Sequence, residues 1–399
     1  MRFLACVLVL GAVGCCLGQS NGASQTGAQD GEIARSISVP ISNHKNGTHA
    51  IQLKIGTPPQ EFNVLIDTVG PTWLTAYNCT PTEPCSGRKK FNGINSASYG
   101  SEQKDEMAVF FRRIYCQRSV LCKVQRKPQV LTSKAIFHSG NVTGPLSRDV
   151  HQLGGVDIGQ HSFINAETLN GVPSYQEYPF DGILGLRLGP HSLLREMART
   201  GVITKPSVGL YFSSDENVTG EALFGGANEN HYQGSLSFLD AESDRFQFRI
   251  TRYDYDGMDR IFPREGDEST AILAPFDPFI RAPWNEIHPL NEWLGGMFKR
   301  NGRYEFHCSS TPADVIFTIA SKQFVLRAED YIMKVNTSDG IKCYSAFVTP
   351  KGYRRGDPSW QLGLPFLRRA YTVLEASLQN PARGRVGFAH VRGDGGIAA

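Results

Sequence analysis

The chain has 399 residues, of which 40% are hydrophobic and 20% are charged, with 41 glycines and 22 prolines. Because this length exceeds what one hydrophobic core usually supports, we expect two domains in a globular, turn-rich and mostly β protein. The formal net charge of +3 is too small to indicate a nucleic-acid partner. The sequence has no glycine-rich phosphate loop and no His/Cys cluster with metal-ligand spacing, so we expect no cofactor and no metal.

Residues 1–18 have the pattern of a secretory signal peptide. Arg2 precedes an apolar run over residues 3–17, which is shorter than the roughly 20 residues of a membrane-spanning helix, and small and polar residues follow. An N-terminal membrane anchor is the alternative interpretation. We expect cleavage near Gly18, a secreted, extracellular protein, and no membrane span in the mature chain.

Loss of this segment changes the cysteine count from nine to six, because three cysteines lie within it. An even number of cysteines fits three disulfides in an oxidising compartment, although many pairings are open from sequence alone. Local spacing favours the pairs Cys79–Cys85 and Cys116–Cys122, which leaves Cys308 and Cys343 as the third pair. Secretion also agrees with Asn-x-Ser/Thr glycosylation sequons at Asn46, Asn78, Asn141, Asn217 and Asn336.

The first strand pattern leads to a single acidic residue. Residues 19–48 are rich in Ser, Gly, Asn and Gln and predict a flexible lead-in. Alternating polar and apolar residues over 49–55 and 61–66, separated by a Gly-Thr-Pro-Pro turn, then predict a β-hairpin that ends at Asp67. A carboxylate at the end of a buried strand is costly to desolvate, so Asp67 is a functional-site candidate.

Short strand patterns separated by Gly, Pro and Asn continue to the end of the chain. Helical patterns occur chiefly at residues 191–199 and 284–293. Between Tyr99 and the later strands lies a basic segment, about residues 101–131, that predicts a disulfide-stapled hairpin through Cys116 and Cys122. A solvated loop is the simpler interpretation, and a binding site for an anionic glycan is the alternative.

Several segments resemble pepsin-like aspartic proteases and occur in that family's order. They begin with Ile55-Gly-Thr-Pro-Pro-Gln-Glu-Phe-Asn-Val-Leu-Ile-Asp67-Thr68, continue with Phe180-Asp-Gly-Ile-Leu-Gly-Leu186, and end with Arg385-Val-Gly-Phe-Ala389. The resemblance implies a bilobal, mostly β fold, with an inter-lobe cleft that binds a peptide or protein and is covered by a hairpin flap. It implies an N-terminal lobe over 49–210 and a C-terminal lobe over 211–391, followed by a tail over 392–399. Separately, we expect a monomer. In this comparison the basic segment is an insert.

The family's chemistry uses two carboxylates, one from each lobe, which share a proton and activate a water molecule. Each lies in an Asp-Thr/Ser-Gly turn, and the hydroxyl links one turn to the other. By resemblance Asp67 is the first acid and Thr68 the hydroxyl residue, but Val69 replaces the glycine. The first turn is therefore altered but keeps its acid.

The second turn lacks its acid. Residues 271–283 align without gaps to the family's second catalytic segment, and Ala274 stands at the position of the second catalytic Asp. Pro275 replaces the hydroxyl residue and Phe276 the glycine. Asp277 is the alternative second acid, although a turn aspartate between prolines is the interpretation we favour.

The predicted flap also departs from the family. Phe137 occupies the place of the flap tyrosine, so the ring is kept and the hydroxyl is lost. His138, Ser139 and Gly140 follow at the flap tip, and with Thr68 and Phe137 they are the expected cleft residues. The sequence therefore predicts a catalytically inactive homologue that retains a binding cleft. The alternatives are an active endopeptidase that uses Asp67 with Asp277 or another group, and a surface-binding module that acts through the basic insert.

Overall fold

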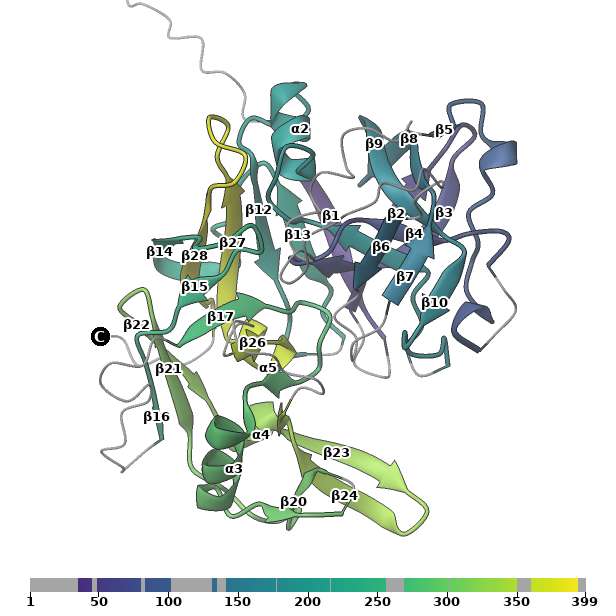
Figure 1. The fold of residues 1–399 in the computed structure, drawn as a ribbon. Coiled ribbons are helices and arrows are strands. Elements are labelled where there is room, and N and C mark those ends of the chain that lie inside the picture. The colour runs from purple at the N-terminus through teal and green to yellow at the C-terminus, as the bar shows by residue number, and fades with distance from the viewer. Residues whose placement is uncertain are drawn as a thin grey trace, which may run out of the picture. The chain divides into compact units, whose positions relative to one another are not determined.

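The computed structural model describes residues 35–44, 49–79, 83–101, 131–134, 141–176, 178–215, 217–255, 269–300, 302–349 and 360–393. These residues form mostly β-strands, as the sequence predicts (Figure 1). The predicted signal peptide, Asn46, Cys116, Cys122 and Phe137 to Gly140 lie outside the described residues, as does nearly all of the basic insert.

The elements of the N-terminal half, up to residue 215, are mostly short strands. The strands are β1 (Ile37–Asn43), β2 (His49–Ile55), β3 (Gln60–Asp67), β4 (Trp73–Thr75), β5 (Gly100–Ser101), β6 (Leu131–Lys134), β7 (Asn141–Gly144), β8 (Leu146–Leu153), β9 (Val156–Ala166), β10 (Thr168–Asn170), β11 (Gly182–Gly185) and β12 (Ser207–Tyr211). The helices are the 3₁₀-helices η1 (Glu83–Cys85) and η2 (Gly93–Asn95) and the α-helix α2 (Leu193–Arg199).

The C-terminal half, from residue 217, continues this pattern. Its strands are β13 (Gly220–Phe224), β14 (Tyr232–Asp240), β15 (Phe248–Arg249), β16 (Arg252–Tyr255), β17 (Thr270–Leu273), β18 (Ile280–Arg281), β19 (Met297–Phe298), β20 (Tyr304–Phe306), β21 (Val315–Ile319), β22 (Lys322–Leu326), β23 (Ile332–Thr337), β24 (Gly340–Ser345), β25 (Phe347–Val348), β26 (Trp360–Leu362), β27 (Ala370–Ala376) and β28 (Gly384–Val391). Its helices are α3 (Trp284–Trp293), α4 (Ala328–Tyr331) and α5 (Leu364–Leu367).

The predicted hairpin that leads to Asp67 is confirmed. Strands β2 and β3 pair antiparallel, with Ile51 opposite Val64 and Leu53 opposite Phe62, and these four side chains are buried. The apolar alternation of the sequence therefore becomes one buried face, and the hairpin delivers Asp67 to the end of β3.

The sheet around this hairpin closes on itself. Pairings run from β2 to β3, β11, β4, β9 and β8, and β8 pairs again with β2. In this ring β11 pairs parallel with β3 and antiparallel with β4. Strand β3 therefore has a paired neighbour on each side, and Asp67 at its end pairs with Gly185 of β11.

The prediction of a flexible lead-in through residue 48 is wrong for residues 37–43. Strand β1 pairs antiparallel with β13 and with β2, and it buries Ile37, Val39 and Ile41 on one face. The Ser, Pro and Asn residues between them are compatible with a half-buried strand, because they occupy the other face. Through β1, the ring joins a run of strands in the order β13, β12, β27, β28, β14.

A similar strand arrangement occurs in the C-terminal half. Strand β26 pairs parallel with β17 and antiparallel with β18, as β11 pairs with β3 and β4. Strand β17 ends at Leu273, one residue before Ala274, and β3 ends at Asp67 itself. The two turns that the sequence singles out therefore follow corresponding strands.

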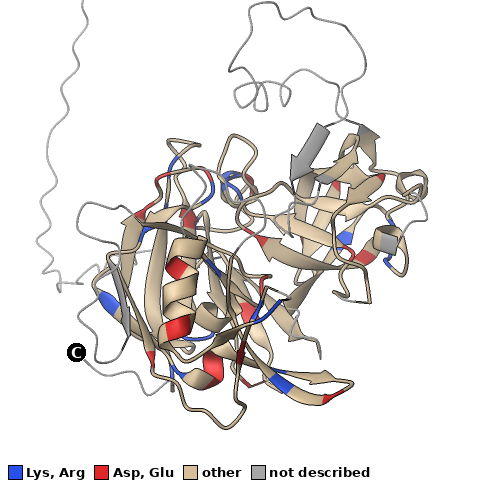
Figure 2. Cartoon of the chain, turned by 60° about the horizontal axis from the view of Figure 1, so that its bottom comes forward, with Lys and Arg blue, Asp and Glu red and all other residues tan. Residues whose placement is uncertain are grey.

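The predicted helical windows are confirmed as α2 and α3. Helix α2 buries Leu193, Leu194 and Met197, and α3 buries Ile287 and Leu290. Within the described residues, no helix is both long and apolar enough to cross a bilayer. Lysine and arginine positions are interspersed with acidic positions over the drawn elements (Figure 2).

Two of the predicted disulfides, Cys79–Cys85 and Cys308–Cys343, are formed. The first closes the short segment that contains η1, and the second joins the segment after β20 to β24.

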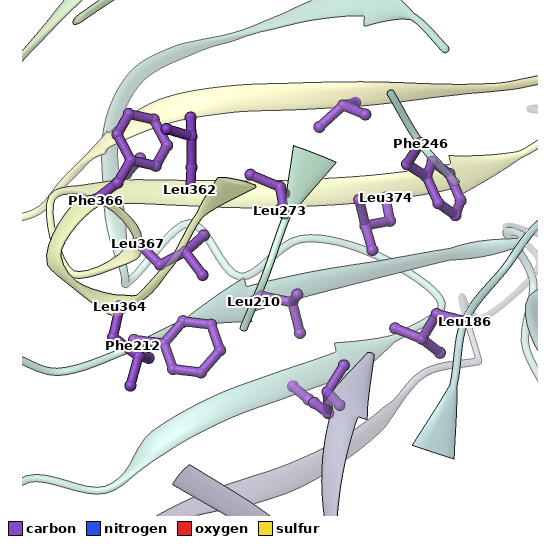
Figure 3. Close-up of a cluster of buried hydrophobic side chains, with 14 of the residues drawn as sticks. Leu186, Leu210, Phe212, Phe246, Leu273, Leu362, Leu364, Phe366, Leu367 and Leu374 are labelled. Carbon is purple, nitrogen blue, oxygen red and sulfur yellow. The ribbon is translucent and has the colours of Figure 1, made fainter. Parts of the chain in front are cut away.

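The largest buried cluster includes side chains from both halves, among them Leu186, Leu210, Leu273, Leu362 and Leu374 (Figure 3). Leu273 in this cluster fixes the start of the second predicted turn.

Candidate active site

Asp67 is buried, with 1% of its surface exposed. Its carboxyl oxygens accept hydrogen bonds from the first turn itself: Oδ1 from the Val69 N–H at 3.1 Å and Oδ2 from the Gly70 N–H at 2.7 Å. The Leu186 N–H donates to its backbone carbonyl at 2.7 Å. Asp67 therefore has the hydrogen bonds that a buried carboxyl needs without a second carboxyl beside it.

Close approach of the crossing strand holds this turn in place. A Cβ on Gly185 would lie 2.3 Å from the Gly70 carbonyl oxygen and 2.7 Å from the Thr72 nitrogen, so only glycine fits there. The Gly185 N–H donates to the Thr72 hydroxyl at 3.0 Å. The backbone of β11 thus packs directly against the turn that contains Asp67.

Burial raises the pKa of the Asp67 carboxyl above its ordinary value, and hydrogen bonds from Gly70, Val69 and Thr68 oppose the shift. The folded protein therefore holds this proton to a higher pH than the unfolded chain does. As the pH rises from about 4 through the folded pKa, the unfolded state releases its proton first, so the free energy of unfolding is expected to fall by up to about 1.4 kcal/mol per pH unit.

Urea unfolding of the wild type and of Asp67→Asn across this pH range measures the effect. Other acids contribute equally to both proteins, so the difference between their pH profiles isolates Asp67. Asp67→Asn is expected to be less stable at low pH, because its amide nitrogen cannot accept a backbone N–H, and to lose the downward slope. Parallel pH profiles for the two proteins would contradict the assignment of this slope to the raised pKa of Asp67.

Thr68 links the two turns, as the resemblance implies. Its buried hydroxyl donates to the Leu273 carbonyl oxygen at 2.7 Å, across 205 positions of sequence. The reciprocal bond from the second turn is impossible, because Pro275 has neither a hydroxyl nor an N–H. Half of the expected two-way connection therefore remains.

The second turn is an ordinary proline β-turn. The Asp277 N–H donates to the Ala274 carbonyl oxygen at 2.9 Å, which closes the four residues Ala274 to Asp277. Pro275 lies at the second position of this turn, where its fixed φ is favourable. Ala274 itself is 1% exposed and presents a methyl group where the resemblance places the second acid.

Phe276 packs away from its own half of the chain. Its side chain, 1% exposed, belongs to a buried cluster whose other buried members come from residues 50–183, including Trp73, Ile164 and Phe180. The Phe276 ring therefore fills space in this cluster that the family's glycine, which has no side chain, would leave open. The second turn therefore contributes apolar contact between the halves and has no acid at position 274.

Asp277 is bound to a different partner. Both of its oxygens contact the Arg281 guanidinium: Nε donates to Oδ2, and Nη2 donates to Oδ1 at 3.1 Å. The Phe279 N–H also donates to Oδ1, at 3.0 Å. The two side chains are 4% and 10% exposed, so this is a buried bidentate ion pair. Arg281 was not predicted from the sequence, although its spacing of four residues from Asp277 is visible there.

The described residues thus bring together Asp67, Thr68 and the backbone of the second turn. They hold no group of three His, Cys, Asp or Glu side chains that could bind a metal ion. The predicted cleft residues from Phe137 to Gly140 cannot be placed beside Asp67, because they lie outside the described part of the chain.

Comparison with known proteins identifies the family. The family described as eukaryotic aspartyl protease matches residues 48–111 and 129–391, and the residues between these segments lie inside the predicted basic insert. Pepsin A of Rhinolophus ferrumequinum is 25% identical over 346 residues, which cover 84% of this chain and 80% of that protein. Vacuolar protease A of Neurospora crassa is 26% identical over 357 residues, covering 87% and 81%.

Pregnancy-associated glycoprotein 4 of Ovis aries is also similar, with 26% identity over 347 residues that cover 84% of this chain and 81% of that protein. The mostly β architecture and the family match agree with the predicted pepsin-like fold. The chain belongs to the eukaryotic aspartyl protease family.

Proposed function

We propose that this protein is a secreted, glycosylated and catalytically inactive aspartic protease homologue that binds a peptide or protein. The observation that carries the proposal is the second turn, where Ala274, Pro275 and Phe276 replace the acid, the hydroxyl and the glycine together. Asp67 is left as a buried acid bonded to its own turn. Its role in this proposal is structural.

The chemistry of the site supports inactivity. A carboxylate pair divides general acid and general base work, and each such contribution is worth roughly 10²–10⁴-fold in rate. Groups that act as a unit lose nearly the whole effect when one is removed. A methyl group at position 274 supplies neither proton transfer nor charge, so Asp67 alone lacks its counterpart.

Asp277 is poorly suited to replace the missing acid. Its two oxygens are engaged by the Arg281 guanidinium and the Phe279 N–H, in a bidentate arrangement that fixes the direction of the carboxylate. To share a proton with Asp67 it would have to leave a buried ion pair. The alternative of an active endopeptidase that uses Asp277 is therefore the weaker one.

Secretion and glycosylation rest on independent observations. The two disulfides of the described residues are typical of proteins from oxidising compartments. The sequon asparagines Asn78, Asn217 and Asn336 are exposed and can accept a glycan without disturbing the core. The alternative of a surface-binding module depends on the basic insert, outside the described residues, and stays a prediction.

A peptidase assay on protein secreted from eukaryotic cells tests the proposal. We expect no pepstatin-sensitive cleavage of a denatured protein between about pH 3, where a pepsin-like carboxyl pair holds one shared proton, and about pH 7. Asp67→Asn serves as the matched control, because it removes the remaining acid. Cleavage that pepstatin inhibits and that Asp67→Asn abolishes would overturn the proposed inactivity.

A further inference from the structure

Arg245 lies in the loop over residues 242–247, for which the sequence predicts no function. The Glu242 N–H donates to the Gln247 carbonyl oxygen at 2.7 Å and closes the loop. The Leu188 N–H donates to the Asp244 carbonyl oxygen at 2.9 Å, and two residues earlier the Leu186 N–H donates to the Asp67 carbonyl oxygen at 2.7 Å. One short segment therefore joins the Arg245 loop to the turn that carries Asp67.

The acidic residues of this loop are paired with other arginines. Asp244 accepts a hydrogen bond from Arg187 Nε at 2.9 Å, and Glu242 forms an ion pair with Arg249. The half-buried Arg245 guanidinium has no hydrogen bond or ion pair with any described residue. This arrangement leaves the Arg245 guanidinium available to a ligand.

The backbone after Arg245 is strained. Phe246 has a φ of 53°, in the left-handed region that bulky residues rarely adopt, and its ring is fully buried. A conformation of this kind is unfavourable for a bulky residue, and such conformations concentrate at functional sites. The buried ring anchors the loop and fixes the position of the neighbouring Arg245.

The charge of Arg245 reaches the Asp67 carboxyl, where it opposes the larger effect of burial on the pKa of that group. The oxygens of Asp67 accept the Val69 and Gly70 N–H groups, and Asp277 is paired with Arg281, so neither carboxyl forms an ion pair with Arg245.

We propose that Arg245 is a specificity residue of this site and binds a carboxylate of the peptide ligand. The inference rests on the proposed binding function and adds the chemical class of the ligand. A guanidinium binds a carboxylate through two parallel hydrogen bonds, which a neutral amide cannot reproduce. Phosphate recognition generally uses a cluster of arginines, so one unpaired arginine fits a carboxylate better. An acidic side chain or a peptide C-terminus can supply it.

Fluorescence polarisation at low salt with labelled peptides of equal length tests the inference. One peptide carries a central pair of Glu residues, and the other carries Gln at the same positions, each with a free or an amidated C-terminus. We expect the Glu peptide to bind the wild type about tenfold more tightly than the Gln peptide, because hydrogen bonds between charged groups are worth about 1.5–3 kcal/mol. Weaker binding after amidation identifies the C-terminus as the source of the carboxylate.

Two variants separate Arg245 from general charge. Arg245→Gln is expected to lose the preference for the charged peptide, whereas Arg245→Lys keeps the charge without the planar fork and is expected to retain part of it. Arg249→Gln is the matched control, because it removes a cation of the adjoining strand β15 that is already paired with Glu242. Thermal unfolding of each variant verifies that it is folded.

Equal affinity of the wild type for all four peptides, Glu or Gln and free or amidated, would overturn the inference and leave the proposed function standing. Absence of binding to all the peptides would contradict both. Cleavage of the peptides would contradict the proposed inactivity. In that case an Arg245-dependent preference for Glu would still support the inference, and equal cleavage of both peptides would overturn it.

Discussion

Ala274→Asp is expected to show no peptidase activity, although it returns a carboxyl to the second turn. Pro275 still lacks the hydroxyl and N–H that would orient this carboxyl, and the Phe276 ring still fills space within a cluster of the other half. Catalytic groups that are misplaced by about 1 Å can lose about 10²-fold in rate. The assay is cleavage of a denatured protein with and without pepstatin.

The same substitution is expected to destabilise the protein. Position 274 is 1% exposed, so a new carboxylate there is buried without a cation or a preformed set of donors. We expect the free energy of unfolding to fall by about 3 kcal/mol at neutral pH. The loss is expected to be smaller near pH 4, where the new carboxyl can be protonated. Ala274→Asn controls for size and polarity and should lack this pH dependence.

A triple variant that also carries Pro275→Thr and Phe276→Gly separates the acid from the turn. It restores the hydroxyl and N–H, and it removes the ring. Activity in the triple variant alone would agree with the view that turn chemistry limits the single substitution. Robust pepstatin-sensitive turnover in Ala274→Asp would contradict that view, because a carboxyl alone would then have been sufficient.

Local patterns were enough to predict the first half of this site. Apolar alternation predicted the hairpin of β2 and β3, and the position of Asp67 at its end followed from the chain order. The aligned second segment also predicted the loss of an acid at Ala274. These features depend on residues within one or two strands, where sequence spacing and spatial position are closely related.

The remaining contacts join residues that are distant in sequence. Nothing in the order of the residues places the Phe276 ring among side chains from residues 50–183. The Arg281 side chain could equally have pointed to solvent, since the direction of a side chain after a β-turn depends on the turn's conformation. Strand β1 was missed because its apolar residues lie in a polar, Ser-rich segment and acquire meaning only when β13 pairs with them.

Arg281→Met is expected to lower the free energy of unfolding by about 3–5 kcal/mol. The substitution keeps an apolar stem of similar length but leaves the Asp277 carboxylate buried without its cation. The Phe279 N–H remains as a donor to Oδ1, and the contact of the Arg281 guanidinium with the Phe279 ring is lost. Urea unfolding at neutral pH measures the change.

The ion pair between Arg385 and Glu375 provides the matched control. Its Nε–Oε1 distance is 2.9 Å and it is also bidentate, but its side chains are 47% and 26% exposed. Arg385→Met is therefore expected to cost no more than about 1 kcal/mol. The double variant Asp277→Asn/Arg281→Met should recover most of the stability lost in Arg281→Met, because it removes the unpaired charge and keeps an acceptor for the Phe279 N–H. Equal losses in Arg281→Met and Arg385→Met, or no recovery in the double variant, would show that Asp277 does not depend on Arg281 for its burial. Asp277 would then be available as an acid, and the alternative of an active site formed with Asp67 would regain support.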